Sequence, residues 1–128
     1  MTNLERTKAF LRSLETRDGS TLSFYAPDVV QREFPNQFTK AGATRDLEAL
    51  RRSGEAGKKS VREQRYEIIN AVEHGDEVAL EAIWTAKLNV PVGTLAAGDV
   101  MKAHLGMFFT WRDGQIVSQR NYDCFDPF

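Results

Sequence analysis

The closing stretch of the chain carries the side chains best suited to acid–base chemistry. It reads Asn121-Tyr122-Asp123-Cys124-Phe125-Asp126-Pro127-Phe128, so a carboxyl, an amide and a phenol stand close together among apolar residues. Side chains alternate between the two faces of a strand, so Asp123 shares its face with Asn121 and Phe125. A carboxyl desolvated by burial can act as an acid or a base near neutral pH. Asp123 is therefore a candidate catalytic residue, and a strand-capping carboxylate is the alternative.

A histidine and a cysteine lie in the last two strand-like runs of the sequence. His104 is a polar group among apolar neighbours, which makes it a candidate catalytic residue or hydrogen-bond donor. A structural histidine satisfied by hydrogen bonds is the alternative. Cys124 has no activating base near it in the sequence, although His104 could approach it across a hairpin. Free cysteines are usually small buried hydrophobes, and this is the simpler interpretation of Cys124.

No pattern in the sequence indicates a cofactor or a metal. It contains no glycine-rich phosphate loop and no nucleotide-binding fingerprint. The two histidines, His74 in a predicted turn and His104 in a predicted strand, form a poor metal-ligand set. The single cysteine excludes an internal disulfide and cannot form a zinc site by itself. We therefore expect neither a cofactor nor a metal.

Aromatic and amide side chains in the strand-like runs could line a pocket for a small ligand. Tyrosine and tryptophan suit a pocket wall because one part of each side chain is apolar and another is polar. The alternative is that these residues are ordinary core. The candidate pocket residues are Tyr66, Trp84, Phe108, Asn121 and Tyr122.

An Asp113-Gly114 turn organises the C-terminal part of the chain. Asp-Gly between two strand-like runs favours a type I′ turn, which needs positive φ at both central positions. We predict antiparallel strands over Lys102 to Arg112 and over Gln115 to Phe125. Another pair of long strands is predicted upstream, over Arg62 to Glu73 and over Glu77 to Val90.

Two helices are predicted at the start of the chain. The first runs from about Asn3 to Thr16, and Thr2 and Glu5 have the spacing of a capping box at its start. The second is short, begins after Ser20 and is ended by Pro27.

A short strand and a third helix follow. The strand is predicted over Asp28 to Phe34, at an edge or an end of the sheet because Pro35 follows it. The helix begins at Thr44 and ends near Lys59. Its inner stripe includes Gly54 and Gly57, which would allow close approach to a sheet.

This order of elements indicates the α+β class. Long antiparallel strands must twist and bend, which gives a strongly curved mixed or antiparallel sheet with a concave side. We expect a cone-shaped barrel in which three N-terminal helices cover the concave side and enclose an internal pocket.

The totals of the sequence limit its class. At 128 residues, the chain has the size of one domain with a single core, spanning 1–128. The net charge of −1 argues against a nucleic-acid-binding face, which needs a basic excess. No run of about 18 apolar residues could cross a membrane, and the N-terminus lacks the pattern of a signal peptide. We expect a soluble cytoplasmic protein that binds neither nucleic acid nor membrane.

Three segments resemble a known family. YAPDVVQREFPN, RDGQIV and the closing RNYDCFDPF, together with the order of the elements, are similar to the nuclear transport factor two-like superfamily. Within it, the chain resembles the SnoaL-like branch named after polyketide cyclases. The resemblance covers nearly the whole chain and implies the cone-shaped fold. It does not decide the chemistry, because this fold hosts isomerases, cyclases, dehydratases, epoxide hydrolases and non-catalytic members.

The resemblance also implies site residues and a partner. Related enzymes use one or two carboxyls of raised pKa in an apolar pocket, with Tyr, Trp or His donors beside them. Asp123 in the last strand and Glu33 at the end of the first short strand lie near the positions of those carboxyls. The isomerase branch carries its acid directly before a proline, whereas here Phe34 stands between Glu33 and Pro35. Glu33 could instead pair at the surface with a neighbouring arginine. Family members commonly form homodimers through the outer face of the sheet.

Two functions follow as hypotheses. The first is cofactor-free isomerisation, cyclisation, dehydration or epoxide hydrolysis of a small hydrophobic carbonyl or hydroxyl compound. Asp123 or Glu33 would be the acid or base, and His104, Tyr66 or Tyr122 would donate hydrogen bonds. The second is a non-catalytic module that binds a small ligand or dimerises.

Overall fold

The computed structural model describes residues 1–128 as one α+β domain with a single sheet. The six strands lie in the order β2-β1-β6-β5-β4-β3, and only the β1–β6 pair is parallel. The sheet is mixed, as expected, but it does not close, so the expected cone-shaped barrel does not form. In chain order the elements are α1 (Asn3–Thr16), the 3-10 turn η1 (Thr21–Phe24), β1 (Tyr25–Glu33), β2 (Ala43–Arg45), α2 (Leu47–Ser60), β3 (Val61–His74), β4 (Glu77–Leu88), β5 (Val100–Arg112) and β6 (Gln115–Phe125).

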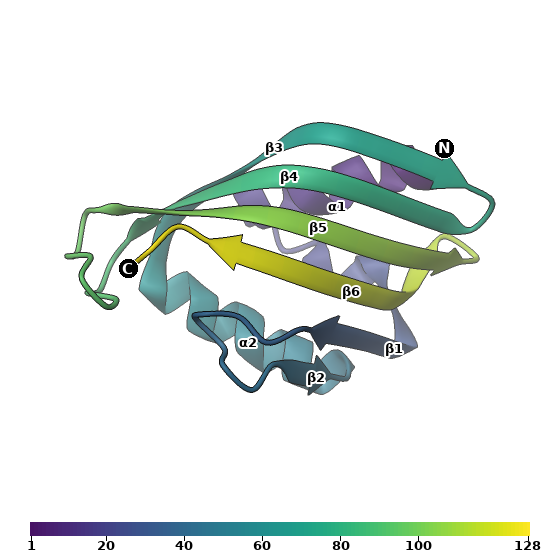
Figure 1. Ribbon diagram of the computed structural model, residues 1–128. Coiled ribbons are helices and arrows are strands. Elements are labelled where there is room, and N and C mark those ends of the chain that lie inside the picture. Colours follow the sequence, from purple (N-terminus) through teal and green to yellow (C-terminus); the bar gives the residue numbers. More distant parts are fainter.

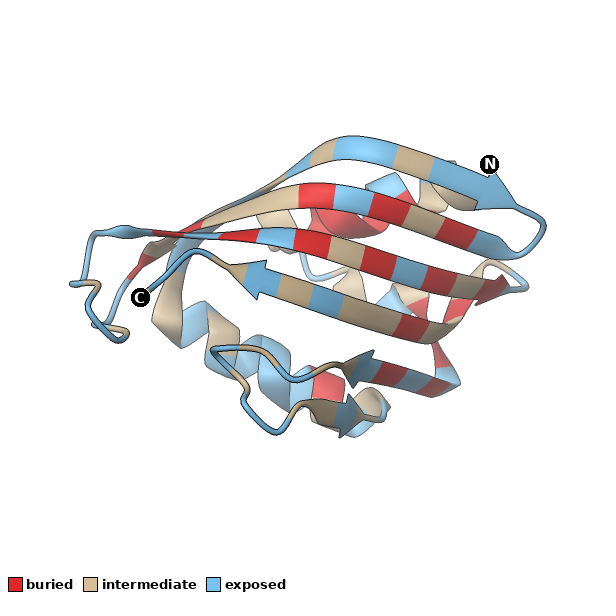
Figure 2. Ribbon diagram, viewed as in Figure 1, coloured by how far each residue is buried: buried red, intermediate tan, exposed pale blue.

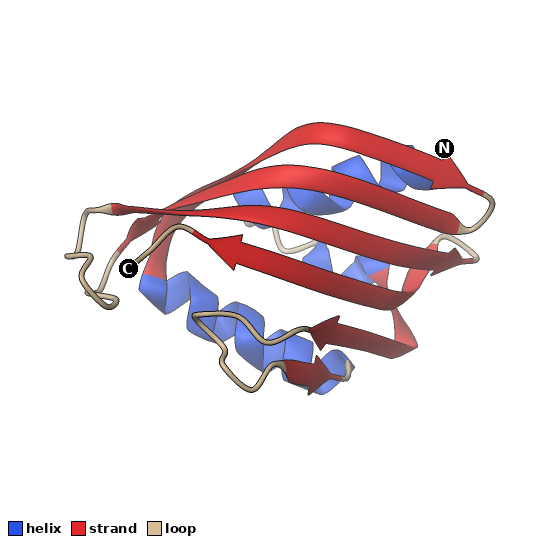
Figure 3. Ribbon diagram, in the orientation of Figure 1, coloured by secondary structure: helices blue, strands red, loops and turns tan.

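Both α-helices lie on the same side of the sheet, which we call its inner face (Figures 1 and 3). Helix α1 packs against β3 and β4, and α2 packs against β1. Neither helix is long and apolar enough to cross a membrane. The other side of the sheet, its outer face, carries no helix.

Two of the three predicted helices are present, and the prediction of a second N-terminal helix is wrong. Helix α1 has the predicted bounds, and the Thr2 hydroxyl caps it by accepting from the Glu5 amide at 3.0 Å. The predicted second helix is a single 3-10 turn, because the chain enters β1 at Tyr25 and pairs there with β6. Helix α2 begins at Leu47 rather than Thr44, since the three residues before its Asp46 cap form β2.

The hairpin of β5 and β6 has the predicted turn. Asp113 and Gly114 have φ values of 51° and 77°, as a type I′ turn requires. Side chains along β4 and β5 alternate between buried and exposed positions, as the banding in Figure 2 shows. The buried side chains face the helices and the exposed ones face away from them. Neighbouring residues of a strand therefore lie on opposite faces, the inner and the outer.

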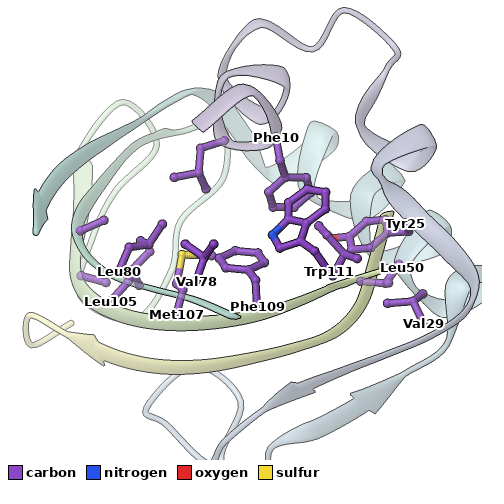
Figure 4. Close-up of a cluster of buried hydrophobic side chains, with 14 residues drawn as sticks. Phe10, Tyr25, Val29, Leu50, Val78, Leu80, Leu105, Met107, Phe109 and Trp111 are labelled. Atoms are coloured by element: carbon purple, nitrogen blue, oxygen red, sulfur yellow. The ribbon is translucent and has the colours of Figure 1, made fainter. Parts of the chain in front are cut away.

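The hydrophobic core lies between the sheet and the helices (Figure 4). Phe10 of α1 makes edge-to-face contacts with Tyr25 at 5.4 Å and Phe109 at 5.7 Å between ring centroids. The indole nitrogen of the fully buried Trp111 donates to the Thr7 hydroxyl at 3.0 Å. These contacts dock α1 on the sheet through both apolar area and a satisfied buried polar pair.

The two glycines of α2 do not mark a close approach to the sheet, contrary to the prediction. A Cβ atom built on Gly54 or Gly57 would meet no heavy atom within 4 Å. Both residues therefore weaken the helix without a packing reason.

Replacing Gly54 by alanine should stabilise the protein. Alanine loses less backbone entropy than glycine in a helix, so we expect Gly54→Ala to raise the free energy of unfolding by about 0.5–1 kcal/mol. Urea denaturation measures this change. Gly42→Ala is the comparison for which the opposite effect is expected. Gly42 has φ +69°, and an added Cβ would lie 2.7 Å from the Glu33 carbonyl oxygen. Gly42→Ala should destabilise, and a stabilised Gly42→Ala or a destabilised Gly54→Ala would contradict this assignment.

Candidate active site

Strand register gathers polar side chains on the inner face at β6, β1 and β2. Gln119 pairs with Phe109 of the core, so Gln119 points to the inner face. The same row continues through Gln31 to Arg45 on the neighbouring strands. The next row pairs Asn121 with Glu33. Three strands thus contribute to one polar patch beside the apolar wall of β3 to β5.

Glu33 and Arg45 form an ion pair within this patch. Arg45 Nη1 donates to Glu33 Oε1 and to Gln31 Oε1, each at 2.9 Å. The Asn36 amide donates to the other carboxylate oxygen of Glu33 at 2.8 Å. Burial opposes the charged form of Glu33, but hydrogen bonds from Asn36, Thr39 and Arg45 outweigh it and lower the pKa of Glu33. Glu33 is therefore an ionised, well-partnered carboxylate.

Asp123 is the opposite kind of carboxyl. It lies on the inner face one row beyond the end of β1, where the chain leaves the sheet at Pro35, so no strand pairs with β6 on that side. Its Oδ1 atom is buried and has no hydrogen-bond partner. Burial raises the pKa of Asp123 to about 6; the negative charge of Glu33 adds to this rise and Arg45 opposes it. The two carboxyls thus differ in charge state near pH 6.

A chain of hydrogen bonds leads from the buried core to the site. The Tyr25 hydroxyl donates to Gln119 Oε1 at 3.2 Å, and Gln119 Nε2 donates to Asn121 Oδ1 at 3.1 Å. Tyr25 and Gln119 are 6% and 2% exposed, so the bond between them is shielded from water, whereas the bond from Gln119 to Asn121 is partly buried. Asn121 and Asp123 are two residues apart and share the inner face of β6.

Aromatic side chains form the apolar side of the site. Tyr66 and Trp84 are cross-strand partners on the inner face of β3 and β4. Trp84 donates to Gln64 Oε1 at 2.9 Å and contacts Phe125 edge to face at 6.1 Å. Burial raises the pKa of Tyr66 and the charge of Asp123 raises it further, so the Tyr66 hydroxyl stays protonated beside that carboxyl.

The sequence and the architecture match one family. Residues 7–119 match the family described as the SnoaL-like domain. The chain belongs to the SnoaL-like domain family. No curated protein matches the sequence of this domain significantly.

Solved structures share the fold of this SnoaL-like domain. IdmH, a candidate polyketide cyclase from Streptomyces antibioticus, has a TM-score of 0.80 and 18% identity over 96% of this chain and 92% of its own. A nuclear transport factor two-like protein of unknown function from Burkholderia pseudomallei has a TM-score of 0.77 and 15% identity over 98% and 92%. TerC, co-crystallised with polyporic acid, has a TM-score of 0.74 and 21% identity over 97% and 91%. At these identities the likeness shows the fold and not the activity.

Three of the expected site residues lie on the other side of the SnoaL-like sheet. His104, Phe108 and Tyr122 point to the outer face, because their sequence neighbours Leu105, Phe109 and Asn121 point inward. His104 is exposed and pairs across the hairpin with the exposed Cys124. Tyr122 stacks on Phe34 with ring centroids 4.4 Å apart. The expectation that these residues line a site with Asp123 is corrected.

The remaining expected residues are brought together on the inner face, as are four that the sequence analysis missed. Asp123, Glu33, Asn121, Tyr66 and Trp84 all face the helices. The missed residues are Tyr25, Gln31, Arg45 and Gln119. The period-two pattern could have added Gln119 to Asn121 and Gln31 to Glu33. Arg45 had no such signal, because its short strand resembles the start of the next helix.

The titration of Asp123 should respond in opposite directions to its two charged neighbours. Carbon-detected NMR should give a pKa near 6 for Asp123 in the wild-type protein. Glu33→Gln removes a negative charge and leaves Arg45 unpaired, so the pKa should fall. Arg45→Met removes the positive charge, so the pKa should rise. Asp126→Asn, at an exposed position after β6, is the matched control and should change nothing. A wild-type pKa near 4, or shifts of the reverse sign, would contradict the electrostatic assignment.

Proposed function

We propose that this SnoaL-like domain is a cofactor-free acid–base catalyst for a small, largely apolar carbonyl compound. Asp123 moves the proton. The observation that carries the proposal is the buried Oδ1 atom of Asp123, which has no hydrogen-bond partner, on a carboxyl whose pKa is raised to about 6. A buried polar atom without a partner costs stability, and such atoms in native structures often serve a function.

The proposed reaction begins with removal of a proton from the carbon next to a carbonyl group. The Asp123 carboxylate takes the proton, the electron pair of the broken C–H bond forms a C=C bond, and the carbonyl becomes an enolate. Return of the proton to another carbon gives an isomer. Attack of the enolate carbon on a second carbonyl gives ring closure, and the alkoxide so formed takes the proton back. A pKa near 6 leaves Asp123 mostly ionised at neutral pH yet more basic than an ordinary aspartate.

The ion pair of Glu33 and Arg45 sets the basicity of Asp123 in this proposal. Glu33 is held ionised by its own partners, and its charge keeps the pKa of Asp123 high. Arg45 limits this effect, so Asp123 still ionises below neutral pH. Two carboxyls with separated pKa values are typical of acid–base sites. Glu33 is thus proposed as a positioning and tuning residue, not as the base.

The aromatic side of the site provides binding energy for the apolar part of the substrate. Tyr66, Trp84 and Phe125 present ring surface on the inner face beside Asp123. Burial of apolar area stabilises a bound ligand by about 25 cal/mol per Å². Low polarity beside Asp123 also preserves its raised pKa.

Hydrogen–deuterium exchange tests the proposed proton transfer without knowledge of the natural substrate. The probe is 2,4-pentanedione in D2O, followed by proton NMR of its central carbon. We expect the wild-type protein to accelerate this exchange about 100-fold or more over an equal concentration of acetate. Asp123→Asn should abolish the acceleration, whereas Asp126→Asn should retain it. Exchange that persists in Asp123→Asn, or no acceleration by wild type, would overturn the acid–base proposal in favour of a ligand-binding module.

We also propose that two copies of the domain associate through the outer face. Exposed apolar side chains gather there, on β1, β3, β5 and β6: Val30, Val72, Phe108 and Tyr122. A hollow of about 470 Å³ lies over β3 to β6, where Gly106 leaves room beside Phe108 and Tyr122. Apolar patches of this kind on an uncovered sheet face favour a protein partner.

The oligomeric state tests this second proposal directly. Sedimentation equilibrium should give a dimer mass for the wild-type protein. Phe108→Glu places a charge at the hollow and should produce monomers with an unchanged far-ultraviolet circular dichroism spectrum. Lys8→Glu, on the helix side, is the matched control and should remain dimeric. A monomeric wild type at micromolar concentration would overturn the association.

A further inference from the structure

We infer that the side-chain amide of Asn121 binds the carbonyl oxygen of the substrate, and that Tyr25 and Gln119 are positioning residues that fix the direction of this amide. The inference rests on the proposed proton transfer by Asp123. It adds the hydrogen-bond donor that an enolate-forming reaction needs.

Two hydrogen bonds connect Tyr25 through Gln119 to Asn121, and we call this chain the relay. Its direction follows from the buried hydroxyl of Tyr25. The Tyr25 hydroxyl has one acceptor, Gln119 Oε1, at 3.2 Å. Burial raises the pKa of Tyr25, so its hydroxyl keeps its proton. A carboxamide has its oxygen and its nitrogen on opposite sides, so the nitrogen of Gln119 must point away from Tyr25. It donates to Asn121 Oδ1 at 3.1 Å.

The reversed relay is disfavoured by the same residues. Rotating the Gln119 amide by half a turn would place its NH2 group against Tyr25 and leave the phenolic O–H without an acceptor. An unsatisfied buried donor is costly, and both Tyr25 and Gln119 are almost fully buried. Occupation of Asn121 Oδ1 by Gln119 therefore directs the Asn121 NH2 group away from the relay.

The result is a free donor next to a free acceptor. The N–H groups of Asn121 have no acceptor within the chain, and Asp123 Oδ1 has no donor. The two residues are two apart on the same face of β6, so their Cα atoms are about 7 Å apart. Neither group satisfies the other. In the proposed complex the carbonyl oxygen of the substrate accepts from Asn121, and the neighbouring carbon lies against Asp123.

This arrangement matches the charge changes of enolate formation. As Asp123 removes the proton, negative charge grows on the carbonyl oxygen and strengthens its hydrogen bonds from the Asn121 NH2 group. A donor held in place beforehand needs no reorganisation when that charge develops. The relay fixes the orientation of the Asn121 amide. When Asp123 returns the proton to the substrate, its carboxylate is regenerated and the Asn121 amide is free to bind the next substrate.

The test uses the same exchange of 2,4-pentanedione with three variants. Asn121→Leu keeps the size of the side chain and removes the donor. We expect its kcat/KM to fall about 10- to 100-fold, with the pH midpoint that reports Asp123 unchanged. Tyr25→Phe removes the hydrogen bond to Gln119, so the amides of Gln119 and Asn121 are no longer held in one direction. We expect kcat to fall about 3- to 10-fold at an unchanged KM. Asp126→Asn, at an exposed position after β6, should behave as wild type.

A second readout is independent of catalysis. In nitrogen-15 spectra of the side-chain amides, Tyr25→Phe should shift the NH2 signals of Asn121, although the relay connects these residues only through Gln119. Asp126→Asn should leave those signals in place. Thermal unfolding of each variant identifies any loss of activity that comes from misfolding.

Each outcome separates this inference from the acid–base proposal. If Asp123→Asn loses exchange while Asn121→Leu retains the wild-type rate, Asn121 does not bind the oxygen and the inference fails alone. If Tyr25→Phe changes neither kcat nor the Asn121 signals, the positioning role fails. If Asp123→Asn retains exchange, the proposed base fails first and the inference fails with it.

Discussion

The parallel pairing of the first strand with the last one is the constraint on which the candidate site depends. Residues 34–114 separate β1 from β6 in the sequence. The register of the two strands sets Gln31 beside Gln119 and Glu33 beside Asn121. A slip of β1 by one residue would turn Gln31 and Glu33 to the outer face, away from Gln119 and Asn121. Strand β2 can deliver Arg45 to Glu33 only because β1 already has its place. The charges around Asp123 are thus a product of long-range topology.

The inner face of the sheet carries both the hydrophobic core and the candidate site. Near the turn between β5 and β6, aromatic packing around Phe10 and Trp111 docks α1 on the sheet (Figure 4). Farther from this turn, polar groups of β6, β1 and β2 face the ring surfaces of Tyr66 and Trp84. A well-packed core allows the domain to tolerate one unpaired buried carboxyl oxygen elsewhere. Core and site residues share the same rows of the inner face, with the core residues on β5 and the polar residues on β6.

Local patterns in the sequence predict more of this structure than long-range ones do. The Asp113-Gly114 turn and the alternation of β6 suffice to place Asn121 with Asp123, and helix α1 follows from its periodicity and cap. The same alternation already separates His104 from Leu105 and Tyr122 from Asn121, so their assignment to the pocket conflicted with the pattern itself. The pairing of β1 with β6 and the role of Arg45 have no local signal, because both depend on contacts between distant segments.

The unpartnered oxygen of Asp123 also links the folding of the domain to pH. In the folded chain this carboxyl holds its proton up to about pH 6, whereas in an unfolded chain it loses it near 3.8. Between these values the folded state binds more protons, so this one group makes the free energy of unfolding fall as the pH rises. Above pH 6 the carboxyl is ionised in both states, and the full cost of burying its charge lowers the free energy of unfolding. The conditions that prepare Asp123 to accept a proton are those in which it opposes folding most, and a mildly acidic medium relieves that opposition.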